Sequence, residues 1–211
     1  MGWLNSSRAW HRVLTAILIA TAAAGTAIAA ESPCATAEQA QQVQAFYREN
    51  PGTMPVIAAR RLGMPETVVV SGLPAEQWAS APGSAFAEIW TAMTGWGEVT
   101  FLIMKGSNVF EIKSAVGAGT PSKTSQYYNI EYKHPLRGHL RPDLYDAIYA
   151  IAIPGKEGVP ARGIITYDAS GDAVFGAFVS GEGPPPPASE IAKFDEVMAL
   201  VRSKPPVCPR G

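Results

Sequence analysis

The sequence is poor in the side chains from which metal centres and nucleophilic active sites are usually built. Its 211 residues include three histidines and two cysteines, and the cysteines have no zinc-type spacing. It contains no Gly-x-Ser-x-Gly nucleophile elbow and no Gly-rich phosphate loop. A Ser-His-Asp triad would have to use His134 or His139, and no serine has a distinctive context. These absences exclude the commonest hydrolase, nucleotide-binding and zinc-protein patterns.

Clusters of positive charge are also missing. The chain has 17 Lys and Arg residues against 18 Asp and Glu residues. Removing the first 30 residues, which contain Arg8 and Arg12 but no acid, leaves 15 basic and 18 acidic residues, a net charge of −3. Nucleic acid and anionic membranes both favour clustered Lys and Arg. We therefore expect no nucleic-acid partner, although the spacing of residue types at 55–64 resembles that of a helix-turn-helix.

The N-terminal segment has the three parts of a secretory signal peptide. Arg8 and Arg12 form a basic region, residues 13–28 are an apolar run, and Ala27-Ile28-Ala29 supplies small residues for cleavage. The run is shorter and richer in alanine than a spanning helix, which needs about 20 strongly apolar residues. An uncleaved anchor is the alternative.

Cleavage after Ala29 or Ala30 would divide the chain into a signal peptide, 1–30, and a single domain, 31–211. This predicts a periplasmic or secreted protein without a membrane span after cleavage. In an exported chain, Cys34 and Cys208 are most simply one disulfide that joins the two ends, with two free thiols as the alternative.

The pattern of elements predicts an α+β fold. Apolar residues at helical spacing indicate helices at 36–50, 55–62, 65–73, 84–93 and 189–202. Runs rich in β-branched and aromatic residues indicate strands at 98–104, 108–113, 126–132, 147–153, 163–168 and 173–180. Residues 181–187 form a proline-rich connector that cannot join a sheet interior. Helices, then antiparallel strands, then one helix are typical of an α+β domain.

Two features of these strands leave alternatives open. Residues 147–153 (AIYAIAI) have little polar alternation, which indicates a strand covered on both faces. Either a second copy in a homodimer or the chain's own helices could cover it. Glu98 and Glu111 lie on adjacent strands and could act as an acid/base pair, but solvated surface acids are the simpler interpretation.

Residues 127–141 concentrate aromatic, imidazole and cationic groups. The segment YYNIEYKHPLRGHLR holds three tyrosines, two histidines and three cations. Histidine ligates haem iron, aromatic rings stack on a porphyrin, and Arg or Lys pairs with propionates. Taken alone, two histidines in such a segment are more often surface residues than ligands.

Several ordered motifs resemble the ChuX/HutX haem-utilisation carrier family over residues 40–180. They are GTMPVIAARRLGM at 52–64, WGEVTFLI at 96–103, VFEIK at 109–113, YYNI at 127–130, GHL at 138–140 and AVFGAFV at 173–179. The resemblance implies an α+β fold with a curved antiparallel β-sheet, N-terminal helices and a C-terminal helix. It also implies haem as the cofactor and a homodimer formed through the sheet.

The resemblance also implies the residues that would hold haem. His139 matches the downstream haem histidine of the family, and Met104, or Lys105 in a shifted register, stands at the upstream position. Methionine is a competent axial ligand. His134, before Pro135, is the fallback ligand.

Three further residues complete the predicted haem site. Tyr128 would contact the porphyrin, because Tyr127 and Tyr128 alternate faces and only one of them can do so. Arg137 or Arg141 would meet a propionate.

The sequence therefore favours a haem-binding carrier of haem uptake and utilisation. It favours binding over catalysis, because no acid/base pair or reductant site can be assigned. A tetrapyrrole-modifying enzyme, or an exported interaction module of the same fold without haem, is the alternative. Two departures from the family are SGEGP at 180–184, where a basic segment is usual, and the export signal.

Overall fold

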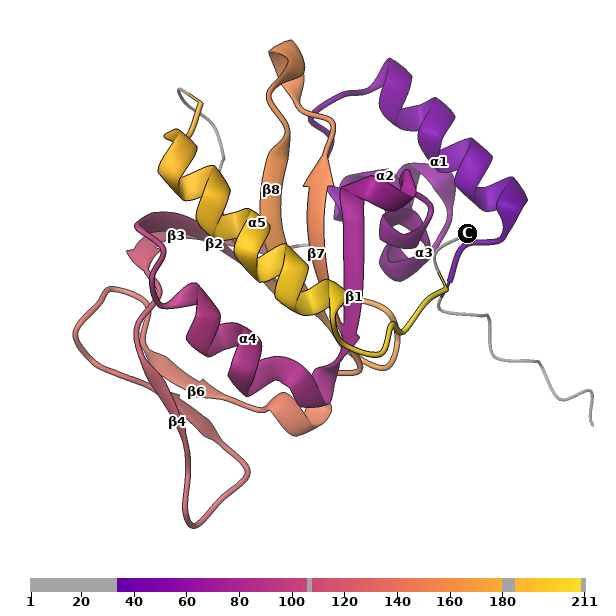
Figure 1. Ribbon diagram of the computed structural model, residues 1–211. Helices are drawn as coiled ribbons and strands as arrows, with labels where there is room; N and C mark the ends of the chain where they lie inside the picture. The colour runs from indigo at the N-terminus through magenta and orange to yellow at the C-terminus, as the bar shows by residue number, and fades with distance from the viewer. Residues whose placement is uncertain (1–33, 106–107, 180–184, 210–211) are drawn as a thin grey trace, which may run out of the picture. The chain divides into compact units, whose positions relative to one another are not determined.

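A six-stranded antiparallel sheet organises the residues that the computed structural model describes, which are 34–105, 108–179 and 185–209 (Figure 1). In spatial order its strands are β1 (Trp78–Pro82), β7 (Ala147–Ile153), β8 (Ala161–Tyr167), β9 (Ala173–Phe178), β2 (Glu98–Lys105) and β3 (Asn108–Ala115). A separate three-stranded sheet contains β4 (Gly119–Pro121), β5 (Tyr128–Ile130) and β6 (Gly138–Leu140).

The helices begin and end at local sequence signals. They are α1 (Ala37–Glu49), α2 (Pro55–Leu62), α3 (Glu66–Ser71), α4 (Phe86–Met93) and α5 (Ala188–Arg202). Thr36 and Gln39 form a capping box at the start of α1. Pro55 occupies the first turn of α2, and Gly63 ends it with a φ of 65°, a conformation that favours glycine. The predicted α+β class is confirmed.

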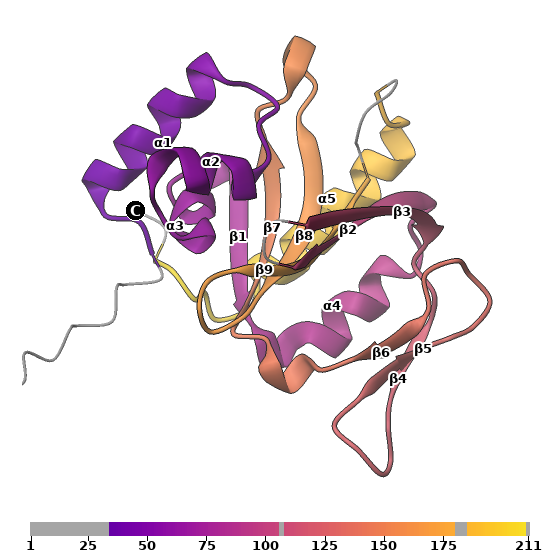
Figure 2. The same ribbon diagram turned by 180° about the vertical axis from the view of Figure 1, so that it is seen from behind.

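The large sheet separates two layers of apolar packing. On one face, α4 and α5 pack against the sheet through Trp90, Phe194, Phe101 and Ile148. The small sheet lies beside α4 on this side (Figure 2). On the opposite face, α1–α3 pack against side chains that include Tyr149 and Tyr167. This alternation follows from the period of two along each strand.

Strand β7 is covered on both faces by helices of its own chain. Ile148 and Ala150 belong to the core beside α4 and α5, and Tyr149 and Ile151 belong to the core beside α1–α3. All four residues are fully buried. A second copy is therefore not needed to explain the apolar strand, and the homodimer stays a prediction.

Several boundaries differ from the sequence-based prediction. Strand β1 was missed, because WASAP is short, rich in alanine and ends in proline, which is tolerated at an edge strand. The strand predicted at 126–132 is the three-residue β5 of the small sheet. The proposed signal peptide lies outside the described residues, as does most of the connector at 181–187.

The two cysteines are joined, as predicted. Cys34 and Cys208 form a disulfide with their Cα atoms 5.5 Å apart, so the start of α1 and the segment after α5 lie together. In the described part of the chain, no helix is long and apolar enough to cross a membrane.

Candidate functional site

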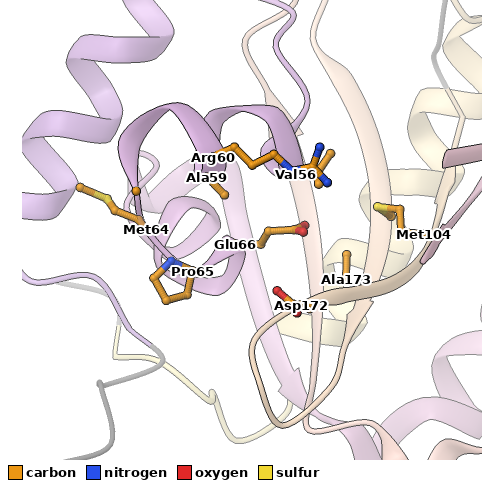
Figure 3. Close-up of a pocket in the computed structure, with 10 residues that line it drawn as sticks. Val56, Ala59, Arg60, Met64, Pro65, Glu66, Met104, Asp172 and Ala173 are labelled. Atoms are coloured by element: carbon orange, nitrogen blue, oxygen red, sulfur yellow. The ribbon is translucent and has the colours of Figure 1, made fainter. Parts of the chain in front are cut away.

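A groove of about 500 Å³ lies between α2–α3 and the part of the large sheet formed by β2 and β9 (Figure 3). Its volume is within the range of small-molecule sites, about 300–1,000 Å³. Its lining consists of Val56, Ala59, Arg60, Gly63, Met64, Pro65, Glu66, Met104, Asp172 and Ala173. The left-handed turn at Gly63 joins the two helices and so brings Met64 and Glu66 to the same wall.

Two thioethers and several aliphatic groups make most of this lining apolar. Met104 projects from β2 on the same sheet face as Leu102, because side chains two positions apart share a face. Met64 also lines the groove from the turn before α3, but Figure 3 shows its side chain pointing away from Met104. Methionine side chains are flexible and polarizable, so they adapt to a ligand, and a thioether sulfur can ligate haem iron. The groove can therefore accept a flat apolar molecule.

The polar part of the groove is dominated by Glu66. Only 8% of this residue is exposed, and its carboxyl points into the space between Arg60, Asp172 and Met104 (Figure 3). Burial, and after it the charge of Asp172, raise the pKa of Glu66 from its ordinary 4.5 to about 7. The backbone N–H of Ala173 and the Arg60 guanidinium oppose this shift. The carboxyl therefore keeps its proton to a higher pH than an exposed glutamate does.

Two buried tyrosines lie behind Glu66. The hydroxyls of Tyr47 on α1 and Tyr167 on β8 make no hydrogen bond within the described part of the chain. Burial raises the pKa of both phenols, and the nearby Glu66 charge raises each of them further. Neither phenol donates a hydrogen bond to the Glu66 carboxyl. The cost of burying the charged carboxylate is therefore not offset on this side.

His139 lies elsewhere, on the exposed side of the small sheet. Its Nδ1 is 2.6 Å from Oδ1 of Asn129, its register partner on β5. The ring packs edge-on against Tyr127, with 5.8 Å between centroids. With the proton on Nδ1, the ring donates to Asn129 and Nε2 keeps its lone pair. This is an arrangement that orients a histidine for ligation.

The cations near His139 already have partners. Arg141 lies 5.6 Å from the Tyr127 ring centroid and forms an ion pair of 2.6 Å with Asp143. This guanidinium holds the pKa of Asp143 below its usual range. Arg137 lies over the ring of Tyr132 at 5.8 Å. Either cation would have to reorient to meet a propionate.

The other residues predicted to bind haem do not join His139. Tyr128 is buried against Phe86 and donates its hydroxyl to the carbonyl of Gly119 at 2.9 Å, so it faces the core. The exposed tyrosine beside His139 is Tyr127. His134 is half-buried, and its Nε2 lies 3.8 Å from a carboxylate oxygen of Glu131.

The structure does not bring Met104 and His139 together. Met104 belongs to the packing layer of α1–α3, whereas β5 packs Tyr128 and Ile130 into the layer of α4 and α5. The large sheet lies between these layers, so the structure does not place the two side chains around one common space. Glu98 and Glu111 are also not adjacent, because Glu98 pairs with Ala115 and Glu111 with Leu102.

The groove residues Glu66 and Asp172 were missed by sequence reasoning. Glu66 follows Pro65 and looks like an ordinary acid in the first turn of a helix. Asp172 lies in the turn between β8 and β9, and nothing in the spacing connects it to Glu66. Within the described ranges, no group of three His, Cys, Asp or Glu residues could hold a metal ion.

Comparison with known proteins identifies the family. The model of the family described as haem utilisation ChuX/HutX matches residues 79–197. The chain belongs to this family. It is 28% identical over 120 residues to the intracellular heme transport protein HutX of Vibrio cholerae. That match covers 56% of this chain and 61% of HutX, so the chain spans less than two thirds of its curated relative.

Solved structures share the fold. A crystal structure of ChuX superposes with a TM-score of 0.65 at 22% identity, covering 76% of this chain and 98% of ChuX. A protein from Agrobacterium tumefaciens has a TM-score of 0.63 at 27% identity, covering 78% of this chain and 92% of the other. A second ChuX structure is named that of a heme-binding protein. Proteins of the ChuX/HutX family bind haem, so the predicted cofactor class is confirmed.

One prediction is contradicted by these relatives. The sequence was interpreted as that of a periplasmic or secreted protein, whereas HutX is named an intracellular transport protein. The interpretation rested on the order of a basic region, an apolar run and small residues at the N-terminus, a pattern that lies outside the described residues. We therefore do not retain the exported location.

Proposed function

We propose that this chain carries haem inside the cell and holds it in the groove beside Met104. The observation that supports this most strongly is the groove itself, a cavity of about 500 Å³ with a thioether on the sheet wall, in a chain of a haem-utilisation family. The intracellular role follows the naming of HutX.

The residues of the groove fit haem as cargo. Aliphatic and thioether side chains of Val56, Ala59, Met64 and Met104 would contact the tetrapyrrole ring. The Met104 sulfur would be the axial ligand from the protein. Arg60 is exposed at the groove and would pair with a propionate. Binding removes apolar ring surface from water, which is the main favourable contribution to affinity.

A second candidate haem-binding site is the exposed face of the small sheet around His139. The observation that favours it is the contact between Nδ1 of His139 and Asn129, together with the edge-on packing of Tyr127. Haem bound there would be exposed on one side and would use His139 without Met104.

Titration with haemin, followed by the Soret band, tests the two locations. We expect Met104→Ala to weaken binding by at least about tenfold, since loss of 1.4 kcal/mol changes affinity by that factor. We expect His139→Ala and the control His134→Ala to retain the wild-type affinity. Loss of binding in His139→Ala alone would move the site to the small sheet. Absence of a Soret shift in the wild type would refute haem binding.

The same titration distinguishes a carrier from an enzyme. A carrier keeps its Soret band when ascorbate and oxygen are added to the complex. Steady bleaching with release of iron would instead indicate an enzyme that modifies the tetrapyrrole.

A further inference from the structure

A buried hydroxyl contacts one sulfur of the disulfide between Cys34 and Cys208. The Tyr149 hydroxyl lies 3.0 Å from Sγ of Cys208, and it is the donor because a disulfide sulfur carries no proton. Burial, and after it the charge of Asp146, raise the pKa of this phenol, so the hydroxyl keeps the proton that it donates. A thiolate accepts a hydrogen bond more strongly than a neutral sulfur does. The contact is therefore strongest when the disulfide is being broken and Cys208 leaves as a thiolate.

The two sulfurs differ in their access to solvent. Cys34 is half-buried, whereas Cys208 is fully buried. A thiol that arrives from solvent can therefore reach the sulfur of Cys34 more easily than that of Cys208. Disulfides are rare in intracellular proteins, and those that occur there are usually transient or redox-sensing. A carrier that works inside the cell, as proposed, would meet reductants able to open this bond.

We propose that Cys34 and Cys208 form a thiol–disulfide exchange site for a small thiol of the glutathione class, and that opening the bond loosens the groove. The exchange goes beyond the proposed function, whereas its effect on the groove rests on that function.

The exchange consists of two attacks on sulfur. The thiolate of one small thiol attacks Sγ of Cys34 and forms a mixed disulfide, and the electron pair of the broken S–S bond leaves on Sγ of Cys208. Tyr149 stabilises this thiolate until it takes a proton from solvent. A second small thiol then attacks the sulfur of the first and releases Cys34. Two small thiols are oxidised to one disulfide, two cysteines are reduced, and the two protons that the small thiols lose end on the cysteines.

The segment after α5 keeps its position without the disulfide. The backbone N–H groups of Val207 and Cys208 donate to Oγ of Ser80 on β1 at 3.1 and 3.4 Å. Neither hydrogen bond depends on the S–S bond. Opening the disulfide therefore releases the Cys34 side, which is the start of α1.

Helix α1 is attached to α3, which forms one wall of the groove. The backbone N–H of Ala35 donates to Oγ of Ser71, the last residue of α3, at 2.9 Å. The side-chain amide of Gln44 donates to the carbonyl of Gly72 at 3.2 Å. The first residue of α3, Glu66, lines the groove. Releasing the start of α1 makes this wall more mobile, so a ligand must order it at an entropic cost.

The exchange is tested on the folded wild type without haem. The full chain is incubated with mixtures of reduced and oxidised glutathione, without denaturant, and free thiols are then alkylated. Mass spectrometry counts the alkylated cysteines, and peptide mapping locates bound glutathione. We expect complete and reversible reduction of the folded protein, with the glutathione of the mixed disulfide on Cys34. A disulfide that opens only in denaturant, or glutathione on Cys208, overturns the inference.

Two tyrosine variants test the hydroxyl beside the leaving sulfur. Tyr149→Phe removes this donor, and the matched control Tyr167→Phe removes a buried hydroxyl that makes no hydrogen bond within the described residues. Glutathione should reduce Tyr149→Phe at least about threefold more slowly than the wild type, as expected for the loss of one hydrogen bond to the leaving group. Tyr167→Phe should be reduced at the wild-type rate. Equal rates in all three proteins would overturn the role of Tyr149.

Haemin titration tests the effect on the groove. The double variant Cys34→Ser with Cys208→Ser represents the open state and needs no added reductant. It should bind haemin at least about fivefold more weakly than the disulfide form, the lower end of the usual coupling between two sites. Equal affinity would overturn the coupling.

Two further results keep the outcomes separate. If the double variant does not fold, wild type that has been reduced by a phosphine in the folded state and kept under argon gives the same comparison. If the oxidised wild type binds no haemin, the proposed function fails, and the glutathione experiment still decides the exchange.

Discussion

The hydroxyl of Tyr149, in the middle of β7, lies 3.0 Å from Sγ of Cys208. The disulfide to Cys34 is thus in direct contact with β7, the neighbour of the edge strand β1. Ser80 on β1 accepts hydrogen bonds from the backbone N–H groups of Val207 and Cys208. The segment after α5 is therefore fixed to two strands of the sheet, and the disulfide joins the start of α1 to the same place.

Removing the disulfide should lower stability substantially. The double variant Cys34→Ser with Cys208→Ser should lose about 3–5 kcal/mol of unfolding free energy, because the bond closes a very long loop in the unfolded chain. Tyr149→Phe, the control, should lose only about 1 kcal/mol for one hydrogen bond. Urea unfolding with and without dithiothreitol measures both. Equal stability of the wild type in the two conditions would contradict the prediction.

The unfolding free energy measured with dithiothreitol is relevant to conditions inside a cell. Cytosolic reductants keep most protein thiols reduced. If the chain carries haem inside the cell, as proposed, the stability measured under reduction is the one that applies there.

Gly83→Ala should destabilise the fold strongly. A Cβ at this buried position would overlap the backbone carbonyl of Tyr145, and the backbone N–H of Gly83 already bonds Asp146 at 2.9 Å. Such overpacking costs about 1–3 kcal/mol or more. Gly95→Ala is the matched control, because its Cβ would meet nothing within 4 Å. If thermal unfolding gives the two variants the same melting temperature, the overlap at Gly83 is refuted as a source of instability.

Stability should also depend on pH through Glu66. Between about pH 4.5 and 7 the folded protein keeps the proton that the unfolded chain loses. The unfolding free energy should therefore decrease as the pH rises through this window, by at most about 3 kcal/mol. Glu66→Gln should remove this part of the pH dependence, and Glu49→Gln should not. Denaturant unfolding at several pH values, without haem, measures the effect.

Trp90 and Trp96 provide a test of one buried hydrogen bond. Trp90 Nε1 donates to the carbonyl of Gly117 at 2.9 Å, which ties α4 to the segment before β4. Trp96 Nε1 is buried and makes no hydrogen bond within the described residues. Both substitutions to Phe remove similar volume, so Trp90→Phe should cost about 1–2 kcal/mol more than Trp96→Phe. If chemical unfolding shows that the two variants lose the same unfolding free energy, the Trp90 hydrogen bond makes no net contribution to stability.

The local elements were predictable where short-range rules decide them. The helix at 55–62 coincides with α2, because Pro55 favours the first turn and Gly63 ends it. The strand at 147–153 coincides with β7, because a continuous aliphatic run favours a doubly buried strand. The small sheet was only partly predicted, since three-residue strands carry too little pattern to be recognised.

The α+β class and the family resemblance were predictable from the chain alone, and its two cysteines favoured one disulfide over two free thiols. These depend on composition, on ordered motifs and on the count of residues, all of which are present in the chain before it folds. The tertiary structure alone decided that Met104 and His139 lie in different layers, because the face that a side chain occupies depends on how its strand packs. It also decided the pKa of Glu66, since Asp172 is distant in sequence and approaches it only when the turn between β8 and β9 meets α3.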